Sequence, residues 1–336
     1  MRFLKRLLII FVILAAVYFI GPHPSKPAYR NDLPELPASA AGLEAFINKQ
    51  ESAHKLKPNN EARIVWANDS LKQKTEYAIV YLHGFSACQE EGNPVHRNIA
   101  KEFGCNLYLS RLSQHGIDTS DALYNMTAEN LWESAKQAYA IGKQLGKKVI
   151  LMGTSTGGTL ALQLAAAYPE IAGLVLYSPN IAINDPNAWL LNDPWGLQIA
   201  RIVKKSKFNT AGHDDPVYRQ YWNYQYRLEA TVQLEELLET TMTKETFEKV
   251  KQPTLTLCYY KDEQHQDPVV KVSAMRTMIA ELGTAADQKK LIPIPDAGTH
   301  VLASPIQSKD IADVQKETLS FLTGVMHLPV KTKTIE

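Results

Sequence analysis

The sequence predicts an α/β fold in which a mostly parallel sheet carries helices on both faces. Short apolar runs alternate with amphipathic segments up to residue 177, and the alternation resumes at residue 254. This order of segments is typical of parallel strands joined by crossover helices. The predicted strands are 62–67, 77–82, 106–109, 148–152, 172–177, 254–260 and 290–294, and the predicted helices are 41–54, 94–103, 128–145, 156–168, 270–282 and 311–322.

Size and composition indicate one packed globular domain with an N-terminal extension. The chain has 336 residues, a net charge of +1 and 45% hydrophobic residues. Such a balanced charge gives no electrostatic reason to expect a nucleic-acid partner. Three cysteines are too few for a disulfide framework, although Cys88 and Cys105 could form one bridge in an oxidising compartment, while Cys258 lies in an apolar run.

Residues 1–21 have the features of an export signal. An uncharged apolar run over 7–21 follows three basic residues, which are Arg2, Lys5 and Arg6. The run is intermediate in length between a signal peptide and a full span, and no small-x-small cleavage pattern follows it. We therefore expect a signal anchor that holds the protein at the membrane, with the large domain on the extracytoplasmic side. A cleaved leader and a secreted protein are the alternative.

Two further segments divide the chain. Residues 22–40 carry five prolines among polar residues, which predicts an extended tether before the domain at 41–336. Around 184–250 the strand–helix alternation stops and aromatic residues accumulate, which predicts a largely helical cap insertion. Most of these aromatic side chains should form the core of the cap, and a few should line an apolar acyl or alcohol pocket over the site.

The stretch from Gly153 to Gly158 indicates a nucleophile. It joins the predicted strand 148–152 to the predicted helix 156–168 and places Ser155 at the turn. A serine on a tight turn between strand and helix presents its hydroxyl outward, and glycine neighbours avoid steric conflict there. We therefore predict that Ser155 is a nucleophile.

A serine nucleophile requires a base, and the base requires an orienting carboxylate. His300 follows the last predicted strand in a loop that contains glycine, and it is the predicted base. Asp267 precedes a proline at a predicted helix start, which would fix its carboxylate, so it is the preferred acid. Asp262 lies nearer the end of the strand 254–260 and remains the alternative.

Backbone N–H groups should stabilise the oxyanion that forms when a serine attacks a carbonyl carbon. Thr156 follows the nucleophile at the start of a helix, and Phe85 lies in the loop after the strand 77–82. These two residues are the predicted oxyanion donors. His83 and His115 are interpreted as structural residues that shape their loops.

The order HGF, GTSTG, aspartate and histidine resembles that of the α/β-hydrolase superfamily, in particular the cap-bearing esterase and monoacylglycerol-lipase-like group. The similarity covers about residues 62–322, and the segment RLSQHG resembles a turn of that group with Ser113 and Gln114 in place of Pro-Gly. The resemblance implies a serine hydrolase that cleaves small carboxylic esters bearing an apolar group through an acyl-enzyme, without a cofactor.

Other chemistries find less support in the sequence. The histidine and aspartate clusters at 213–215 and 265–267 lack a second cluster at metal-ligand spacing, and no nucleotide-binding glycine motif follows a strand. We expect no metal. The alternatives that stay open are a thioesterase, an amidase or peptidase on the same machinery, and a non-catalytic binding protein with this fold.

Overall fold

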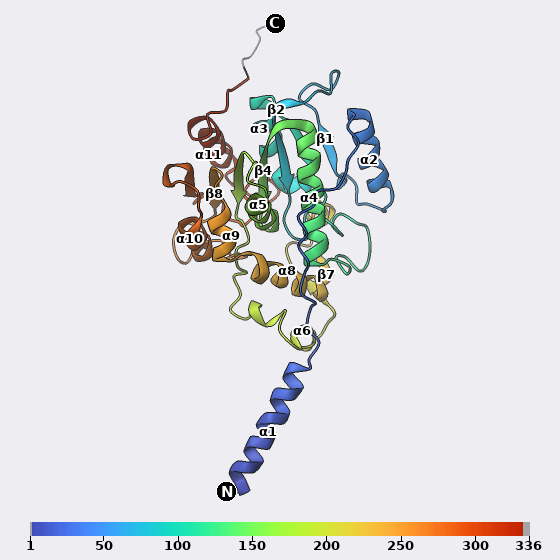
Figure 1. Cartoon of the computed structure of the whole chain (residues 1–336), viewed down its shortest axis with the longest axis vertical. Helices are drawn as coiled ribbons and strands as arrows, with labels where there is room; N and C mark the ends of the chain where they lie inside the picture. Colours follow the sequence, from blue (N-terminus) through green and yellow to red (C-terminus); the bar gives the residue numbers. More distant parts are fainter. Residues whose placement is uncertain (1, 332–336) are drawn as a thin grey trace.

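The computed structural model describes residues 2–331, and a seven-stranded sheet lies at the centre of this part of the chain (Figure 1). The strand order is β1-β3-β2-β4-β5-β8-β9. All neighbouring strands are parallel except β1, which pairs antiparallel with β3. The strands are β1 Arg63–Val65, β2 Thr75–Leu82, β3 Asn106–Leu109, β4 Gly146–Thr154, β5 Gly173–Tyr177, β8 Thr254–Cys258 and β9 Lys289–Pro293. The predicted α/β fold with a mostly parallel sheet is confirmed.

Helices cover both faces of the sheet. The residues of β2 alternate between the two faces: Ala78, Val80 and Leu82 join one buried apolar cluster, and Ile79 and Tyr81 join the other. This alternation follows from the period of two in a strand, and burial on both faces makes the strand apolar throughout. The first cluster packs against α2 Ala40–Ser52, α4 Ala128–Leu145, α5 Thr156–Ala167 and α10 Val272–Glu281, and the second against α3 Val95–Phe103 and α11 Ile311–Gly324.

Local sequence signals explain where several of these helices begin and end. Thr127 accepts a hydrogen bond from the Asn130 N–H, and the Asn130 side chain accepts one from the Thr127 N–H, so a complete capping box starts α4. Gly104 ends α3 in the left-handed conformation that glycine adopts without steric cost. The observed ends therefore lie within about two residues of most predicted ends.

The insertion between β5 and β8 is mixed in structure. It contains a short antiparallel sheet that the expected helical cap did not include, formed by β6 Phe208–Thr210 and β7 Gln225–Arg227. Strands of three residues are too short to give a recognisable alternation in the sequence. The helical elements of the insertion are η2 Ala188–Leu190, α6 Gly196–Lys204, α7 Pro216–Tyr221, α8 Leu228–Thr241 and α9 Lys244–Lys249. Outside the insertion lie two single 3₁₀ turns, η1 Gln89–Gly92 and η3 Ala286–Gln288.

Cysteine chemistry is simple in this structure. Cys88, Cys105 and Cys258 are all buried free thiols. No disulfide joins Cys88 to Cys105, and burial raises the pKa of all three thiols above its ordinary value. The three side chains therefore act as small apolar groups of the core.

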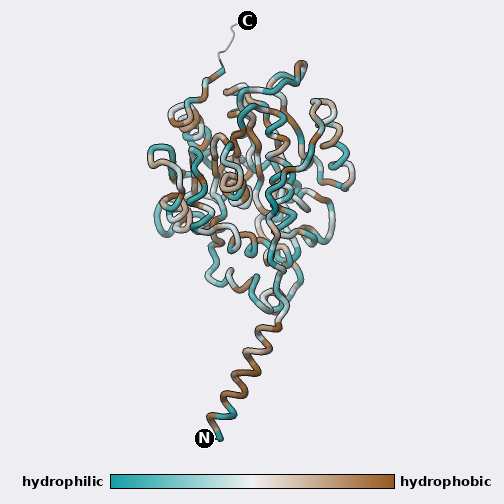
Figure 2. The backbone as a smooth tube through the Cα atoms, viewed as in Figure 1, coloured by the Kyte–Doolittle hydropathy of each residue, from teal (hydrophilic) through white to brown (hydrophobic). Residues whose placement is uncertain are grey.

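The N-terminal helix α1 Arg2–Phe19 projects away from the domain (Figure 1), and Figure 2 shows that its length is mostly apolar. Its side chains are exposed almost throughout. The predicted membrane anchor is not supported: among residues 2–331, no helix is both long enough and apolar enough to span a membrane. The 18 residues of α1 include three charged side chains, those of Arg2, Lys5 and Arg6.

Residues 22–39 have no regular structure and run along the domain surface (Figure 1). Three side chains of the domain donate hydrogen bonds to backbone carbonyls of this segment. Trp132 Nε1 donates to the Arg30 carbonyl at 2.7 Å, Lys136 Nζ to that of Asp32 at 2.8 Å, and Tyr168 Oη to that of Asn31 at 2.6 Å. Trp132 and Lys136 are only 1% exposed, so the segment 22–39 covers buried side chains of the domain and is not a free linker. We call this segment the strap.

This arrangement predicts different outcomes for two N-terminal truncations. Removal of residues 1–21 should leave the free energy of unfolding nearly unchanged, because the strap remains. Removal of residues 1–37 should lower it by about 2 to 5 kcal/mol, since buried donors on α4 and just after α5 lose their acceptors. Urea denaturation of the three proteins measures the difference, and equal midpoints would show that the strap contributes nothing to stability.

Candidate active site

Ser155 lies at the sharp turn between β4 and α5. Its backbone angles are φ 53° and ψ −118°, a conformation that is strained for a residue with a side chain. Four hydrogen bonds hold the turn: the Ser155 N–H donates to the Tyr177 carbonyl at 2.9 Å, and the Ser155 carbonyl accepts from the N–H groups of Gly158, Thr159 and Asn180 at 2.8 to 3.1 Å. The turn therefore presents the serine at the carboxyl edge of the central strands.

The glycines beside Ser155 are required by close approach of the backbone. A Cβ atom on Gly157 would lie 1.9 Å from the carbonyl oxygen of Leu82, and one on Gly153 would lie 2.5 Å from that of Gly157. Real side chains do not tolerate such distances. The absence of side chains at these positions brings the end of β2, and the loop that follows it, directly against the turn of Ser155.

His300 and Asp267 meet in the loops that follow β9 and β8. His300 Nδ1 donates to Asp267 Oδ2 at 2.7 Å. The other carboxylate oxygen, Oδ1, accepts from the N–H groups of Val269 and Val270 at 2.9 and 3.1 Å. Asp267 is fully buried and His300 is 8% exposed. The backbone thus fixes the carboxylate, and the carboxylate fixes the orientation of the imidazole.

The electrostatics of this pair favour its charged form. Burial alone would raise the pKa of Asp267, but the positive charge and hydrogen bond of His300, together with the two N–H groups, bring it below its ordinary value. Burial alone would lower the pKa of His300, but the charge and hydrogen bond of Asp267 and the charge of Glu91 raise it above its ordinary value. His300 is therefore a stronger base than a free histidine.

The alternative acid, Asp262, lies elsewhere. Its carboxylate is exposed and accepts from His265 Nδ1 at 2.8 and 3.0 Å in a surface turn. That hydrogen bond is the largest contribution to the lowered pKa of Asp262. The structure therefore brings Asp267, and not Asp262, to His300.

Of the two predicted oxyanion donors, Thr156 directly follows Ser155, and Phe85 follows Gly84, which packs against Ser155. Thr156 is buried at the first position of α5, where backbone N–H groups have no partner within the helix. Phe85 lies in the loop after β2, with its ring edge-on to that of Tyr226 at 4.9 Å between centroids. The Asn223 N–H donates to the carbonyl of Ser86 at 2.8 Å, so the insertion holds the loop of Phe85 from outside.

His83 and His115 are buried, and both form hydrogen bonds with backbone groups. His83 Nδ1 donates to the Gly84 carbonyl at 2.9 Å, and His83 Nε2 accepts from the Leu112 N–H at 3.0 Å. His115 Nδ1 donates to the Ser113 carbonyl at 2.8 Å. Burial lowers the pKa of both side chains, that of His115 to about 4, so both remain neutral at physiological pH. Their contacts agree with a structural role.

Helix α7 and the residue after it cover the site. Tyr218 and Trp222 are stacked, with 5.1 Å between ring centroids, and they form a small buried cluster with Ala87 and Val301. Ala87 follows the loop of Phe85, and Val301 follows His300. The same aromatic pair therefore packs against both loops of the site.

Glu91 is a buried carboxyl group at this site that the sequence analysis missed. It lies in η1, is 2% exposed and accepts a hydrogen bond from the Gly84 N–H through Oε2 at 2.6 Å. The segment Cys-Gln-Glu-Glu-Gly matches no catalytic motif, and its two adjacent glutamates resemble an ordinary exposed turn. Glu91 is recognised only by its burial next to the loop of Phe85, and this burial is visible only in the structure.

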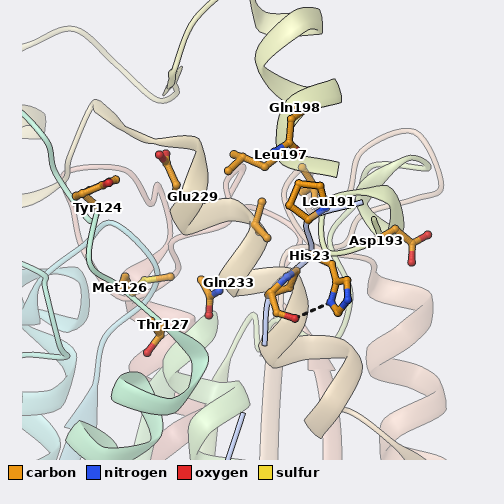
Figure 3. Close-up of a pocket in the computed structure, with 13 residues that line it drawn as sticks. His23, Tyr124, Met126, Thr127, Leu191, Asp193, Leu197, Gln198, Glu229 and Gln233 are labelled. Atoms are coloured by element: carbon orange, nitrogen blue, oxygen red, sulfur yellow. Dashed lines mark hydrogen bonds between the residues drawn. The ribbon is translucent and has the colours of Figure 1, made fainter. Parts of the chain in front are cut away.

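A cavity of about 260 Å³ lies between the strap and the insertion (Figure 3). Four chain segments line it, including His23 of the strap, Met126 of the loop before α4, Leu191 of the insertion and Val232 of α8. Its lining contains none of Ser155, Asp267 and His300. Within residues 2–331, no group of three or more acidic, histidine or cysteine side chains is arranged to hold a metal ion.

A mostly parallel sheet with a strained serine turn after one strand and a His–Asp pair after two later strands defines an α/β hydrolase. A model of the family described as serine aminopeptidase, S33, matches residues 124–297, a little over half of the 336 residues. The chain belongs to this family. The matched segment contains Ser155 and Asp267 and ends shortly before His300.

Several proteins of similar sequence or structure are lipases or lipolytic enzymes. A thermostable monoacylglycerol lipase of Bacillus sp. (strain H-257) is 32% identical over 97 residues, which cover 29% of this chain and only 38% of that relative. A structure of the metagenome-derived lipolytic enzymes LipS and LipT aligns with a TM-score of 0.64 at 17% identity, covering 80% of this chain and all of the other. The monoacylglycerol lipase of Paleococcus ferrophilus aligns with a TM-score of 0.57 at 16% identity, covering 78% and 98%.

The geometry of the serine turn predicts that Gly157→Ala destabilises the protein. Its Cβ would overlap the Leu82 carbonyl, so the free energy of unfolding should fall by at least about 3 kcal/mol. Gly324→Ala at the end of α11 is the matched control, because a Cβ there meets no atom within 4 Å. Urea denaturation should show the control at or slightly above wild-type stability, and a tolerated Gly157→Ala would contradict the close approach.

Proposed function

We propose that this chain is a serine hydrolase that cleaves carboxylic esters through an acyl-enzyme. One observation carries the proposal: the 2.7 Å hydrogen bond of His300 with a buried Asp267, at the edge of the sheet where Ser155 occupies its strained turn. The carboxyl ends of β4, β8 and β9 lie at one edge because these strands are parallel. Three loops that are distant in sequence therefore reach the same edge of the sheet, which supports a serine triad.

In the proposed mechanism, Ser155 Oγ attacks the ester carbonyl carbon while His300 Nε2 takes its proton. The N–H groups of Phe85 and Thr156 hold the oxyanion that forms. His300 then gives the proton to the departing alcohol, which leaves an ester between Ser155 and the acyl group. Water attacks this acyl-enzyme with His300 again as base, and Asp267 stabilises the imidazolium in both steps.

The charge state of His300 sets the pH dependence of this mechanism. Only the neutral imidazole accepts the proton of Ser155, so kcat/KM should fall as the pH drops through the pKa of His300. Because Asp267 and Glu91 raise that pKa, the loss should begin above the pH at which a free histidine titrates. The enzyme should therefore work best at neutral to mildly alkaline pH.

We infer a small ester with an apolar group as the substrate class. Aromatic side chains of the insertion, Tyr218 and Trp222, lie over the two loops of the site and give it an apolar cover. The named relatives include monoacylglycerol lipases and lipolytic enzymes, which supports ester cleavage. The family description, serine aminopeptidase, makes cleavage of an amide bond the second candidate, since the same triad performs both reactions.

Labelling and turnover test the proposal together. The full chain should hydrolyse p-nitrophenyl esters in a series from acetate to palmitate and should gain the mass of a fluorophosphonate on Ser155. Ser155→Ala should lose both the activity and the adduct. Turnover of aminoacyl p-nitroanilides at a higher kcat/KM than the esters would favour the peptidase, and a folded wild-type chain without an adduct would contradict a serine hydrolase.

The two aspartates give a matched pair of variants. Asp267→Asn should lower kcat by roughly 10⁴-fold, because an asparagine in place of the acid orients the wrong tautomer of the base. Asp262→Asn should change kcat less than about twofold, since that carboxylate accepts only from its own surface turn, from His265 and the Gln264 N–H. Steady-state kinetics on the best ester measures both, and a reversed pattern would assign the acid to Asp262.

A further inference from the structure

Glu91 lies against the loop that carries Phe85. Its Oε2 accepts the Gly84 N–H at 2.6 Å. A Cβ atom placed on Gly84 would lie 2.9 and 3.0 Å from the two oxygens of Glu91 and 3.1 Å from the Cβ atom of Ser155. The carboxyl group of Glu91 therefore packs against Gly84, and Gly84 packs against Ser155.

This hydrogen bond adds to the restraints on Gly84, whose carbonyl accepts from His83 Nδ1 at 2.9 Å and from the Ala87 N–H at 3.3 Å. Glu91 holds the N–H of Gly84, and Gly84 directly precedes the Phe85 N–H that should bind the oxyanion. A small rotation at Gly84 would turn that N–H away from the oxyanion, and hydrogen-bond strength falls steeply with misalignment. A fixed acceptor on Gly84 thus contributes to the accuracy of the oxyanion donor.

The groups that face Glu91 come from four parts of the chain. They are Tyr81 of β2, Cys88 beside η1, Tyr218 and Trp222 at α7, and His300 of the loop after β9. Burial raises the pKa of Glu91 to about 7, although the Gly84 N–H, the charge of His300 and the Trp222 side chain oppose that rise. Of these neighbours, His300 is the one that becomes a cation, so the charges of Glu91 and His300 are coupled.

We propose that Glu91 is a positioning residue with two effects: it holds Gly84 so that the Phe85 N–H points at the oxyanion, and it supplies a second negative charge, beside that of Asp267, that stabilises protonated His300. The proposal rests on the proposed serine hydrolase. It adds a residue outside the triad whose loss changes the rate in one way and the pH dependence in another.

Two substitutions separate these effects. Glu91→Ala removes both the acceptor and the charge, and it should lower kcat on the alkaline plateau roughly tenfold with little change in KM, a smaller loss than removal of a whole oxyanion donor. Glu91→Gln keeps an oxygen that can accept the Gly84 N–H, so it should restore most of the plateau rate. Because it lacks the charge, the acidic limb of kcat/KM should move about one unit to lower pH.

Glu90→Gln is the matched control. Glu90 lies in the same turn as Glu91. Its carboxylate accepts from Asn93 Nδ2 at 2.6 Å and not from the loop of Phe85. Its pH profile and plateau rate should match those of the wild type. Urea denaturation of all variants shows whether a lost rate comes from lost folding.

A titration by NMR gives a readout that does not need turnover. The Cε1–H resonance of His300, assigned by its loss in His300→Asn, should titrate about one unit lower in Glu91→Gln than in the wild type. An unchanged His300 pKa together with an unchanged acidic limb, or a wild-type plateau rate in Glu91→Ala, would overturn the proposal. A wild type that neither turns over esters nor accepts the fluorophosphonate would instead overturn the proposed function, while the titration would still decide the coupling of Glu91 to His300.

Discussion

The whole site depends on two backbone segments that approach more closely than any side chain permits. The end of β2 meets the start of α5 at Gly157, where a Cβ atom would lie only 1.9 Å from the carbonyl oxygen of Leu82. That contact holds Ser155 in its strained turn and sets the loop of Phe85 beside it. The hydrogen bonds of the Ser155 backbone then hold the strain in place, and the packed sheet beneath supplies the rigidity that such a conformation needs.

Features that depend on local pattern could be predicted from the sequence. The strands buried on both faces appear as apolar runs, and α4 begins at a capping box, so the order of the central elements follows from short segments. The position of Ser155 at a strand-to-helix turn was predictable for the same reason, because its glycine neighbours lie within the same six residues. The choice between Asp267 and Asp262 required the fold, since only the packing of two loops shows which carboxylate reaches His300.

What the sequence could not give depends on contacts between distant segments. Residues 22–40 were expected to be a tether because their prolines oppose regular structure. The buried donors that bind this segment come from α4 and from the residue after α5, more than a hundred residues away. The antiparallel pair of β6 and β7 is too short to leave a period in the sequence. An acidic residue such as Glu91 is normally expected to be exposed. Burial of Glu91 in the folded protein destabilises its charged form, and this burial depends on a loop that the sequence does not reveal.

The aromatic pair of Tyr218 and Trp222 touches the residue after the loop of Phe85 and the residue after His300. In the proposed mechanism these loops supply the oxyanion donor and the base, so both halves of the machinery share one cover. Lifting that cover would release the two loops at once. One substitution in this aromatic pair would thus disturb the loop of Phe85 and the loop of His300 together, although neither loop is itself changed.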